Sequence, residues 1–237
     1  MFETEGHPII THNRLLSQLS SEDLIPLATK LEPVELSARQ ILYEAGAPLS
    51  HVYFPSTSVM AMTAPLTGRP RIEVATVGNE GMIGVRALLG ADTAPAQVLV
   101  QIPGSALRMK SSDLHAEATI GSRLLPVLFR YANAFLTQLF QSVACNMAHS
   151  LDKRLCRWLL MTQDRVRSDR FPMTHEMLAA MLGVRRASVT EAAGKLQSAG
   201  MIRYTHGKIT ILDRSALESA SCECYRVVRA DFDRLLG

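Results

Sequence analysis

The sequence has no long apolar run. None of its 237 residues lies in a stretch that approaches the roughly 18 consecutive apolar residues of a membrane-spanning helix. The N-terminus also lacks the continuous apolar segment that a secretory signal carries. We therefore expect a cytoplasmic protein without a membrane partner.

Cysteine is scarce as well. The chain has four cysteines, Cys145, Cys156, Cys222 and Cys224, which are too few and too scattered for a disulfide framework. Cys222 and Cys224 are close together, but only distant cysteines remain to complete a tetrahedral metal site with them. We expect reduced thiols, no metal and no other cofactor, and the sequence leaves a redox or metal role of Cys222 and Cys224 open.

Catalytic signatures are missing. His175-Glu176 begins the zinc-protease pattern H-E-x-x-H, but Ala179 occupies the place of the second histidine. Glycines 78, 81 and 84 have the wrong spacing for a dinucleotide or P-loop fingerprint, and the chain has no G-x-S-x-G elbow. We therefore expect that the protein is not an enzyme.

Residues 174–198 carry the clearest positive pattern. Thr174 is a suitable N-cap, and apolar residues follow at helical spacing until Gly183, which ends this first helix. A second helix from Val184 to Ser198 turns one apolar face inward, formed by Val189, Ala192, Ala193 and Leu196. Two short helices joined at a glycine are typical of a helix-turn-helix, whose second helix enters the DNA major groove.

A β-hairpin is predicted directly after these helices. Apolar and polar residues alternate over 201–212 on both sides of His206-Gly207, where glycine permits the positive φ of a tight turn. A hairpin at this place would be the wing of a winged helix.

Between Val34 and Met109 the sequence consists of short alternating apolar runs separated by glycine and proline. These runs lie at 40–43, 51–54, 58–62, 72–77, 98–102 and 106–109. Short strands at this spacing favour an antiparallel barrel or sandwich, and a small barrel can hold one small ligand.

A long helix is predicted from Pro126, because proline is tolerated in a first helical turn. One apolar stripe continues over about six turns, through Leu128, Tyr131, Ala132, Phe135, Leu139, Val143 and Met147. The stripe could pack against the barrel of its own chain, but we favour the seam of a parallel dimer.

Charge is unevenly distributed along the chain. Residues 1–112 contain eight Lys and Arg against ten Asp and Glu, whereas residues 151–237 contain fifteen against ten. The second segment therefore has an excess of five positive charges and is the one that holds the helix-turn-helix pattern. A basic surface of this kind favours contact with phosphates.

This order of elements resembles the Crp/Fnr family of bacterial transcription regulators over nearly the whole chain. The resemblance rests on residues 42–54, on the long helix from Pro126 and on residues 174–212. It implies an α+β fold with a cyclic-nucleotide-binding-type β-roll at 1–122, a dimerisation helix and hinge at 123–149, and a winged helix-turn-helix domain at 150–237. The implied partners are double-stranded DNA, a second copy of the chain and RNA polymerase.

The sensor half departs from the cyclic-AMP-binding members. Their phosphate-binding cassette would fall near residues 83–86, and the arginine-serine pair that grips the phosphate would fall near Ala94-Pro95. A buried phosphate without cationic partners costs several kcal/mol. Arg69, Arg71 or Arg86 could substitute, but we expect no control by cyclic AMP through the usual contacts, and the effector stays unknown.

Two other family sensors are also poorly matched. Oxygen-sensing relatives carry an N-terminal cysteine cluster, which is missing here, and for a haem ligand only His51 of the barrel is available.

In the second helix Arg186 matches a base-contacting position of the family, whereas Ala187 and Glu191 replace the neighbouring glutamate and arginine. We expect Arg186 to contact a guanine, with Arg185 next and with Ser188, Thr190 and Glu191 near base edges or phosphates. Thr174, Lys195, His206 and Lys208 are expected to contact the DNA backbone.

A different interpretation remains open from the sequence. The protein could be a small-ligand sensor whose C-terminal helices bind a protein partner and not DNA. The sequence does not distinguish an activator from a repressor.

Overall fold

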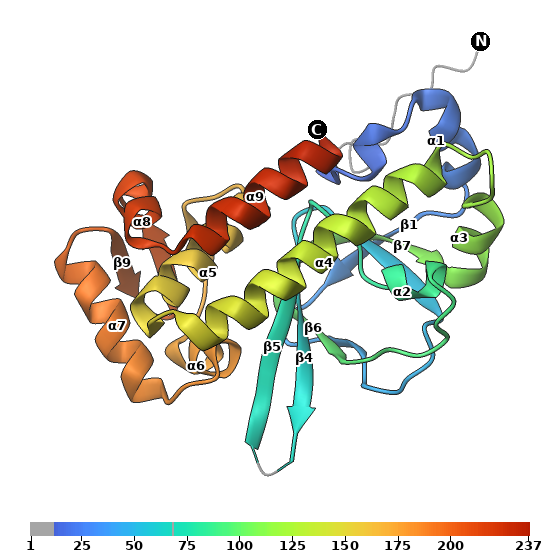
Figure 1. Ribbon diagram of the computed structural model, residues 1–237. Coiled ribbons are helices and arrows are strands. Elements are labelled where there is room, and N and C mark those ends of the chain that lie inside the picture. The colour runs from blue at the N-terminus through green and yellow to red at the C-terminus, as the bar shows by residue number, and fades with distance from the viewer. Residues whose placement is uncertain (1–11, 68) are drawn as a thin grey trace.

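The computed structural model describes residues 12–67 and 69–237. One long helix runs across a β-structured N-terminal half, a mainly helical C-terminal half lies at the far end of this helix, and the C-terminal helix runs back along it (Figure 1). Among these described residues no helix is both long and apolar enough to cross a membrane.

The N-terminal half is built on two antiparallel sheets. Their strand orders are β1-β7-β3 and β2-β6-β4-β5. The strands are β1 (Glu32–Leu36), β2 (Ile41–Tyr43), β3 (His51–Pro55), β4 (Val59–Leu66), β5 (Arg69–Val77), β6 (Gln97–Ile102) and β7 (Gly104–Lys110). All six expected runs form strands, and β1 was not among them. The antiparallel β-roll is therefore confirmed.

Short helices surround this β-roll. They are η2 (Leu16–Gln18), α1 (Ser21–Ala28), α2 (Val85–Leu88) and α3 (Ser111–Glu117). Ser20 and Asp23 form a capping box at the start of α1. Asn13 is fully buried and donates to the carbonyls of Pro55 and Gly81, so it joins the N-terminal segment to the β-roll.

Helix α4 (Leu124–Ala148) covers one side of the β-roll, with Pro126 in its first turn as expected. Tyr131 is fully buried, and its hydroxyl donates to the carbonyl oxygen of Met82 at 2.8 Å. A Cβ atom on Gly81 would lie 2.3 Å from the Tyr131 ring, so only glycine allows α4 to approach this closely. This close approach makes α4 a wall of the N-terminal half.

The expected dimer seam on α4 is wrong for the first part of the stripe. Leu128, Tyr131, Ala132 and Phe135 are buried in the core that α4 shares with the β-roll. From Leu128 to the partly buried Leu139, the stripe therefore packs against the barrel of its own chain, which was the alternative to the dimer seam. Sequence periodicity marks an apolar face but does not distinguish its own barrel from a second copy as the partner.

A different face of α4 is apolar and exposed. Its large side chains are Phe129, Leu136, Phe140, Val143 and Met147, which are 50%, 47%, 68%, 66% and 86% exposed. Their numbers increase by seven, four, three and four, a spacing that keeps them on one helical seam. Of the seven residues in the predicted stripe, Val143 and Met147 belong to this exposed face.

The C-terminal half has a second core and a small sheet of order β8-β10-β9. Its elements are α5 (Leu151–Val166), β8 (Arg170–Pro172), α6 (His175–Leu182), α7 (Arg186–Ser198), β9 (Ile202–Thr205), β10 (Lys208–Ile211), α8 (Arg214–Ala220) and α9 (Glu223–Leu236). Strand β8 was not expected. The winged helix-turn-helix order is confirmed.

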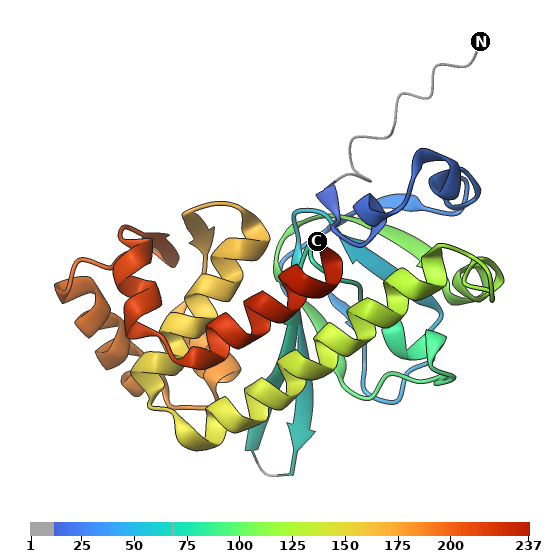
Figure 2. The same ribbon diagram turned by 45° about the horizontal axis from the view of Figure 1, so that its top comes forward.

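Helix α9 leaves this second core and lies beside α4 in both views (Figure 2). Its buried residues Val228, Phe232 and Leu236 belong to the core of the β-roll and α4. The ring centroids of Phe232 and Tyr131 are 6.4 Å apart in an edge-to-face arrangement. The end of the chain therefore packs on the N-terminal half.

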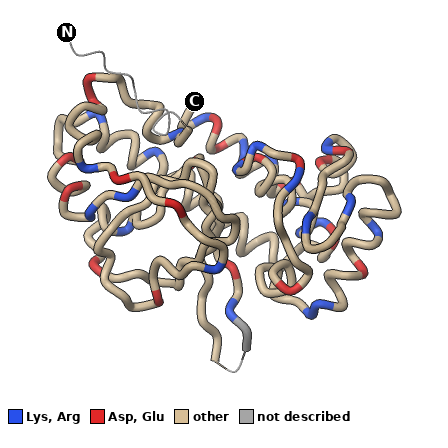
Figure 3. The backbone as a smooth tube through the Cα atoms, turned by 180° about the vertical axis from the view of Figure 1, so that it is seen from behind, with Lys and Arg blue, Asp and Glu red and all other residues tan. Residues whose placement is uncertain are grey.

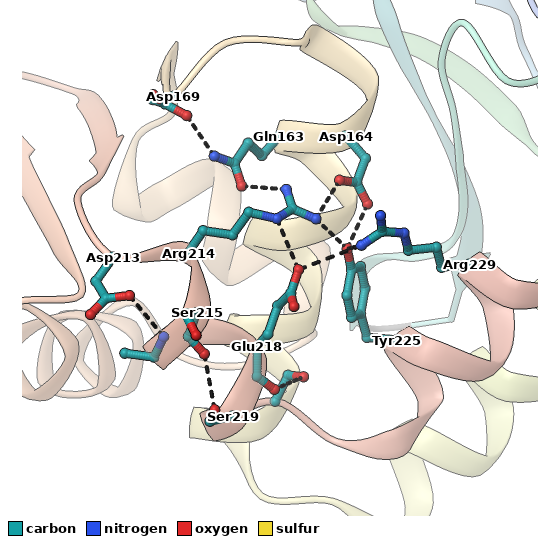
Figure 4. A network of polar contacts seen from close by, with 12 residues as sticks. Gln163, Asp164, Asp169, Asp213, Arg214, Ser215, Glu218, Ser219, Tyr225 and Arg229 are labelled. Carbon is teal, nitrogen blue, oxygen red and sulfur yellow. Dashed lines mark hydrogen bonds and ion pairs between the residues drawn. The ribbon is translucent and has the colours of Figure 1, made fainter.

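A polar network joins the base of α9 to α5 and α8 (Figure 4). Arg214 donates to Asp164 at 2.7 Å and to the hydroxyl of Tyr225 at 2.6 Å, and that hydroxyl donates to Asp164 at 2.9 Å. Arg229 also donates to the Tyr225 hydroxyl, at 3.2 Å. Movement of α9 would therefore disturb the helices that support the winged helix.

Arg165 on α5 makes the main polar contact between the two halves. Its Nε donates to Glu80 at 2.8 Å, and its Nη2 donates to the Thr76 carbonyl at 3.2 Å and to Gln138 of α4 at 2.9 Å. The Arg165 and Glu80 side chains are only 6% and 10% exposed. A Cβ on Gly78 would lie 2.7 Å from Arg165, so this glycine makes room for the arginine.

Glu73 of β5 lies at the same junction and accepts hydrogen bonds from Thr76, from Gln101 and from the indole of Trp158 on α5. Burial raises the pKa of the Glu73 carboxyl from 4.5 to about 7, although the three hydrogen bonds act in the opposite direction. The folded protein therefore favours a protonated Glu73 in mildly acidic solution.

Replacing Arg165 by methionine should lower the free energy of unfolding by about 3–5 kcal/mol, because the buried Glu80 carboxylate loses its partner. Urea denaturation measures the change. The double variant Arg165→Met with Glu80→Met should recover most of the loss, and Arg130→Met on the exposed side of α4 is the matched control. A loss below about 1 kcal/mol for Arg165→Met would contradict this role.

Glu73 should make the protein less stable as the pH rises from about 4.5 to 7. In this range the carboxyl is ionised in the unfolded chain but still protonated in the fold, so the unfolded state is favoured increasingly and the stabilisation is lost by about pH 7. Urea denaturation of Glu73→Gln should show a pH dependence smaller by about 2 kcal/mol over this window. Glu35→Gln, on β1, changes a carboxyl outside this junction and should keep the wild-type slope, and an unchanged slope in Glu73→Gln would refute the assignment.

Candidate nucleic-acid interface

The turn between α6 and α7 forms as the sequence predicts. The Thr174 hydroxyl accepts from the backbone N–H of Met177 and caps α6. Gly183 ends this helix in the left-handed region with φ of +67°, a conformation that favours glycine. The two helices of the motif therefore have their expected order and junction.

Helix α7 begins two residues later than expected. The sequence placed its start at Val184, but Arg185 has the extended backbone of an N-cap and Arg186 is the first helical residue. The backbone N–H of Val184 returns to the Ala179 carbonyl at 3.0 Å, so Val184 completes the turn. The expected inward residues are confirmed as buried: Val189, Ala192, Ala193 and Leu196.

The outer face of α7 is polar. Arg185, Arg186, Thr190, Glu191 and Lys195 are exposed, whereas Ser188 is half-buried. The Arg186 side chain is 66% exposed, and its Nη1 lies 3.3 Å from a Glu176 oxygen of α6. An exposed pair of this kind is weakly held, so Arg186 can exchange Glu176 for another acceptor.

Lys195 is already engaged within the protein. Its Nζ lies 3.3 Å from Glu191, one turn earlier on α7, and 3.4 Å from Asp152 of α5. These contacts join α7 to the first turn of α5. These contacts favour a role for Lys195 in positioning α7 and not in contacting bases.

The hairpin turn has the expected geometry. His206 and Gly207 connect β9 and β10 with φ of +48° and +72°, as a two-residue turn with both residues in the left-handed region requires. Lys208 and His206 are exposed at this tip. The Gly207 carbonyl accepts from the N–H of Met173, so the wing is fixed to the residue before Thr174.

His175 is a residue whose place sequence reasoning missed. Its ring stacks on Tyr204 of β9 with centroids 4.1 Å apart, and its Nδ1 lies 3.0 Å from the hydroxyl of Thr190 on α7. Burial lowers the pKa of His175, and the charge of Arg186 adds to this effect. A neutral His175 therefore joins α6, α7 and the wing, and no local pattern reveals a contact between three separate segments.

The contact with His175 also restricts the orientation of the Thr190 side chain. Its hydroxyl donates to the Arg186 carbonyl at 3.1 Å and meets His175 on its other side. The side chain therefore already helps to fix the shape of the outer surface.

The β-roll encloses a cavity of about 420 Å³ against α4. The cavity is lined by the region where the cassette was expected, including Ile83, Gly84, Ala94 and Pro95, together with Phe135 and Leu136 of α4. Arg86 is the one charged side chain among the described residues that line it. The lining offers mainly apolar contact to a ligand.

The other candidate ligand-binding groups of the N-terminal half differ in their surroundings. Arg71 lies 3.5 Å from Glu44, and Arg86 is exposed on α2. The side chain of Arg69 lies outside the part that the structure describes. His51 is half-buried, and its Nδ1 lies 3.0 Å from the Ser50 hydroxyl.

The description of the cysteines as scattered is wrong for three of them. Cys145, Cys222 and Cys224 converge with His149 where α4 ends and α9 begins, so the fold brings together ligating side chains that the sequence had left as distant candidates. Cys156 of α5 is buried but is not a member of the group. Spacing in the sequence could not reveal this, because His149 and Cys222 are far apart along the chain.

Lys and Arg recur over the winged-helix half of the molecule, including the start of α7 (Figure 3). The exposed polar face of α7 and the exposed His206 and Lys208 at the tip of the wing offer side chains that are suited to phosphates and base edges.

Comparison with known proteins gives the following similarities. Residues 153–220 match the Crp-like helix-turn-helix domain. No curated protein sequence matches the chain. Structurally, FixK2 from Bradyrhizobium japonicum is similar with 17% identity and a TM-score of 0.69, over 81% of this chain and 98% of that one.

Two further solved structures have the same arrangement. The c-di-GMP responsive global regulator CLP of Xanthomonas campestris has 12% identity and a TM-score of 0.66, over 82% of this chain and 100% of its own. A Crp/Fnr-family transcriptional regulator from Thermus thermophilus has 20% identity and a TM-score of 0.64, over 80% of this chain and 98% of that one. At these identities the likeness concerns the fold.

Proposed function

From a chain of the Crp/Fnr fold whose residues 153–220 form a Crp-like helix-turn-helix domain, we infer a homodimeric, sequence-specific transcription regulator. The observation that carries the proposal is the exposed polar face of α7, with Arg186 in its first turn and the wing beside it. Such a helix presents its N-terminal residues to base edges in the major groove. We place the protein in the cytoplasm and assign it no catalytic role.

Each candidate DNA-binding residue has a proposed task. Arg186 contacts guanine O6 and N7, with Arg185 beside it, and Glu176 releases Arg186 on binding. Ser188, Thr190 and Glu191 lie near base edges or phosphates. Lys195, Thr174, His206 and Lys208 contact the DNA backbone and set the position of the helix.

The dimer is proposed to form through the exposed face of α4, with Phe129, Leu136, Phe140, Val143 and Met147 against the same residues of a second copy. Two α7 helices would then address two half-sites about one helical turn apart. In this arrangement the sensor half is 1–122, the dimerisation helix and hinge are 123–149, and the DNA-binding half is 150–237.

Control by cyclic AMP through the usual contacts is not part of this proposal. Among the described residues that line the cavity beneath α4, the one charged residue is Arg86, whose side chain is exposed, and an anionic phosphate needs buried cationic or multiple N–H partners. The lining favours a mainly apolar effector.

Replacing Arg186 by alanine should weaken binding to the specific site by about 1–3 kcal/mol and relax the preference at one base position. Lys208→Ala should weaken binding to all sequences alike and reduce the salt dependence by about one phosphate contact. A duplex selected from a random library provides the specific site, and gel shifts measure the affinities. Arg226→Ala, at an exposed site on α9, is the control. Equal losses on specific and random DNA in Arg186→Ala would refute the base contact.

Replacing Phe140 by glutamate should convert a dimer into a monomer, because two like charges would enter an apolar interface. Sedimentation equilibrium measures the mass, and Ile25→Glu, at a site on α1 that is 61% exposed, tests for a general effect of removing surface hydrophobicity. If wild type and Phe140→Glu have the same mass in solution, α4 is not the interface.

A further inference from the structure

Four side chains that can ligate a metal meet at the hinge. Cys145 lies in the last turns of α4, His149 follows that helix directly, Cys222 caps α9 and Cys224 lies in its first turn. Their ligating atoms all lie within 4.8 Å of one another, and the three cysteines are buried. The chain therefore brings two separate segments together at a single point.

The distances fit the edges of one coordination tetrahedron. With Zn–S of about 2.3 Å and Zn–N of about 2.05 Å, a tetrahedral site places two sulfurs about 3.8 Å apart and a sulfur and a nitrogen about 3.6 Å apart. The Cys145 and Cys222 sulfurs are 3.5 Å apart, and the Cys224 sulfur is 3.6 Å from His149 Nδ1. We propose that Cys145, His149, Cys222 and Cys224 bind one Zn²⁺ ion.

The histidine is oriented for this role. Its Nε2 lies 3.3 Å from Glu223 Oε1, so a proton on Nε2 leaves the Nδ1 lone pair facing the sulfurs. Zinc-binding histidines commonly donate their second N–H to a carboxylate, which fixes the ring and makes the ligand nitrogen more basic. Glu223 comes from the same turn that supplies Cys222 and Cys224, so one turn of α9 provides two ligands and the residue that orients a third.

The surrounding charge also fits. Three thiolates and one Zn²⁺ carry one net negative charge, which is costly to bury without a cation nearby. The positive charge of Arg157 acts on Cys145 and Cys224, and that of Arg154 acts on Cys145. Arg157 is 8% exposed, and its Nε has no hydrogen-bond partner among the residues that the structure describes. A negative zinc-thiolate centre would satisfy this buried cation.

A single ion fits better than the other uses of cysteine. A Cys145–Cys222 disulfide would employ two of the four groups and leave the orientation of His149 toward Cys224 without a purpose. An iron-sulfur cluster binds its cysteines on different irons and so spreads the sulfurs further apart than one ion does. Three sulfurs and one imidazole in a compact tetrahedron are typical of structural zinc.

The place of the site gives it a consequence. It would join the end of α4 to the start of α9, two residues before α5 begins the winged-helix half. Zinc would thereby fix the angle between α4 and α9 and, through the Tyr225 network of Figure 4, the support of the helix-turn-helix. This inference does not depend on DNA binding, because it concerns the metal content and stability of the chain.

The full-length protein, purified under reducing conditions without added chelator and then dialysed, should contain about one Zn²⁺ per chain by elemental analysis. Removal of the metal should lower the Tm by several degrees, since a ligand that binds only the folded state stabilises it, and added zinc should restore the Tm. Co²⁺ in place of zinc should give the absorption of tetrahedral cobalt with thiolate ligands.

The variants distinguish a metal ligand from an ordinary buried thiol. Cys224→Ser should lose the metal, whereas Cys156→Ser, which alters the fourth buried cysteine, should keep it. Glu223→Gln changes an exposed side chain and should not unfold the protein, but it should weaken zinc binding by about 10–100-fold. The Glu223 variant keeps the test decisive if Cys224→Ser fails to fold.

Three results would overturn the proposal. One is that the reduced protein neither contains nor takes up zinc or cobalt. Another is that Cys156→Ser loses as much metal as Cys224→Ser. The last is that the purified protein has a Cys145–Cys222 disulfide and, once reduced, does not bind zinc, which would assign the pair to redox chemistry.

Discussion

The buried ion pair between Arg165 and Glu80 is the interaction on which the arrangement of the molecule depends. Arg165 belongs to α5, yet its guanidinium contacts the β-roll through Glu80 and Thr76 and the long helix through Gln138. Each of these contacts is buried, so losing one partner leaves a charge or a donor without compensation. The winged-helix half is therefore held in one orientation relative to the β-roll, and Gly78 leaves the space that this requires.

Helices α4 and α9 pack along each other and extend from the β-roll to the start of the winged-helix half. The inner face of α4 closes the apolar cavity through Ala132, Phe135 and Leu139, and its last turns supply Cys145 to the group of three cysteines and His149. Helix α9 starts at that group and packs along α4 as far as Leu236. The apolar cavity and the group of three cysteines and His149 therefore border one pair of packed helices, the kind of rigid element through which distant sites are coupled.

Local features of the fold could be predicted from the sequence, whereas contacts between distant segments could not. Gly183 and the His206-Gly207 turn were recognisable because glycine at a positive φ leaves a signal in the residues themselves. Pro126 indicated the first turn of α4, because proline is tolerated there, and the helix itself starts two residues earlier at Leu124. The partner of the α4 stripe, the place of His175 and the meeting of Cys145 with Cys222 depend on tertiary packing, and periodicity contains no information about which surface covers an apolar face. For the same reason the exposed residues of α7 could be named, but not the engagement of Lys195 with Asp152.

We propose that the surface formed by α7 and the wing binds DNA, and the dependence of the binding affinity on salt concentration is a direct test of this proposal. The affinity of the protein for the DNA upstream of its own gene and for a random duplex is measured over a series of ionic strengths. A DNA reader should bind its site more tightly, and the logarithm of its affinity should fall linearly with the logarithm of the salt concentration, with a slope of about −0.9 for each phosphate contacted. Affinity that is nearly independent of salt and equal for both duplexes would contradict the account and favour a sensor whose helices bind a protein.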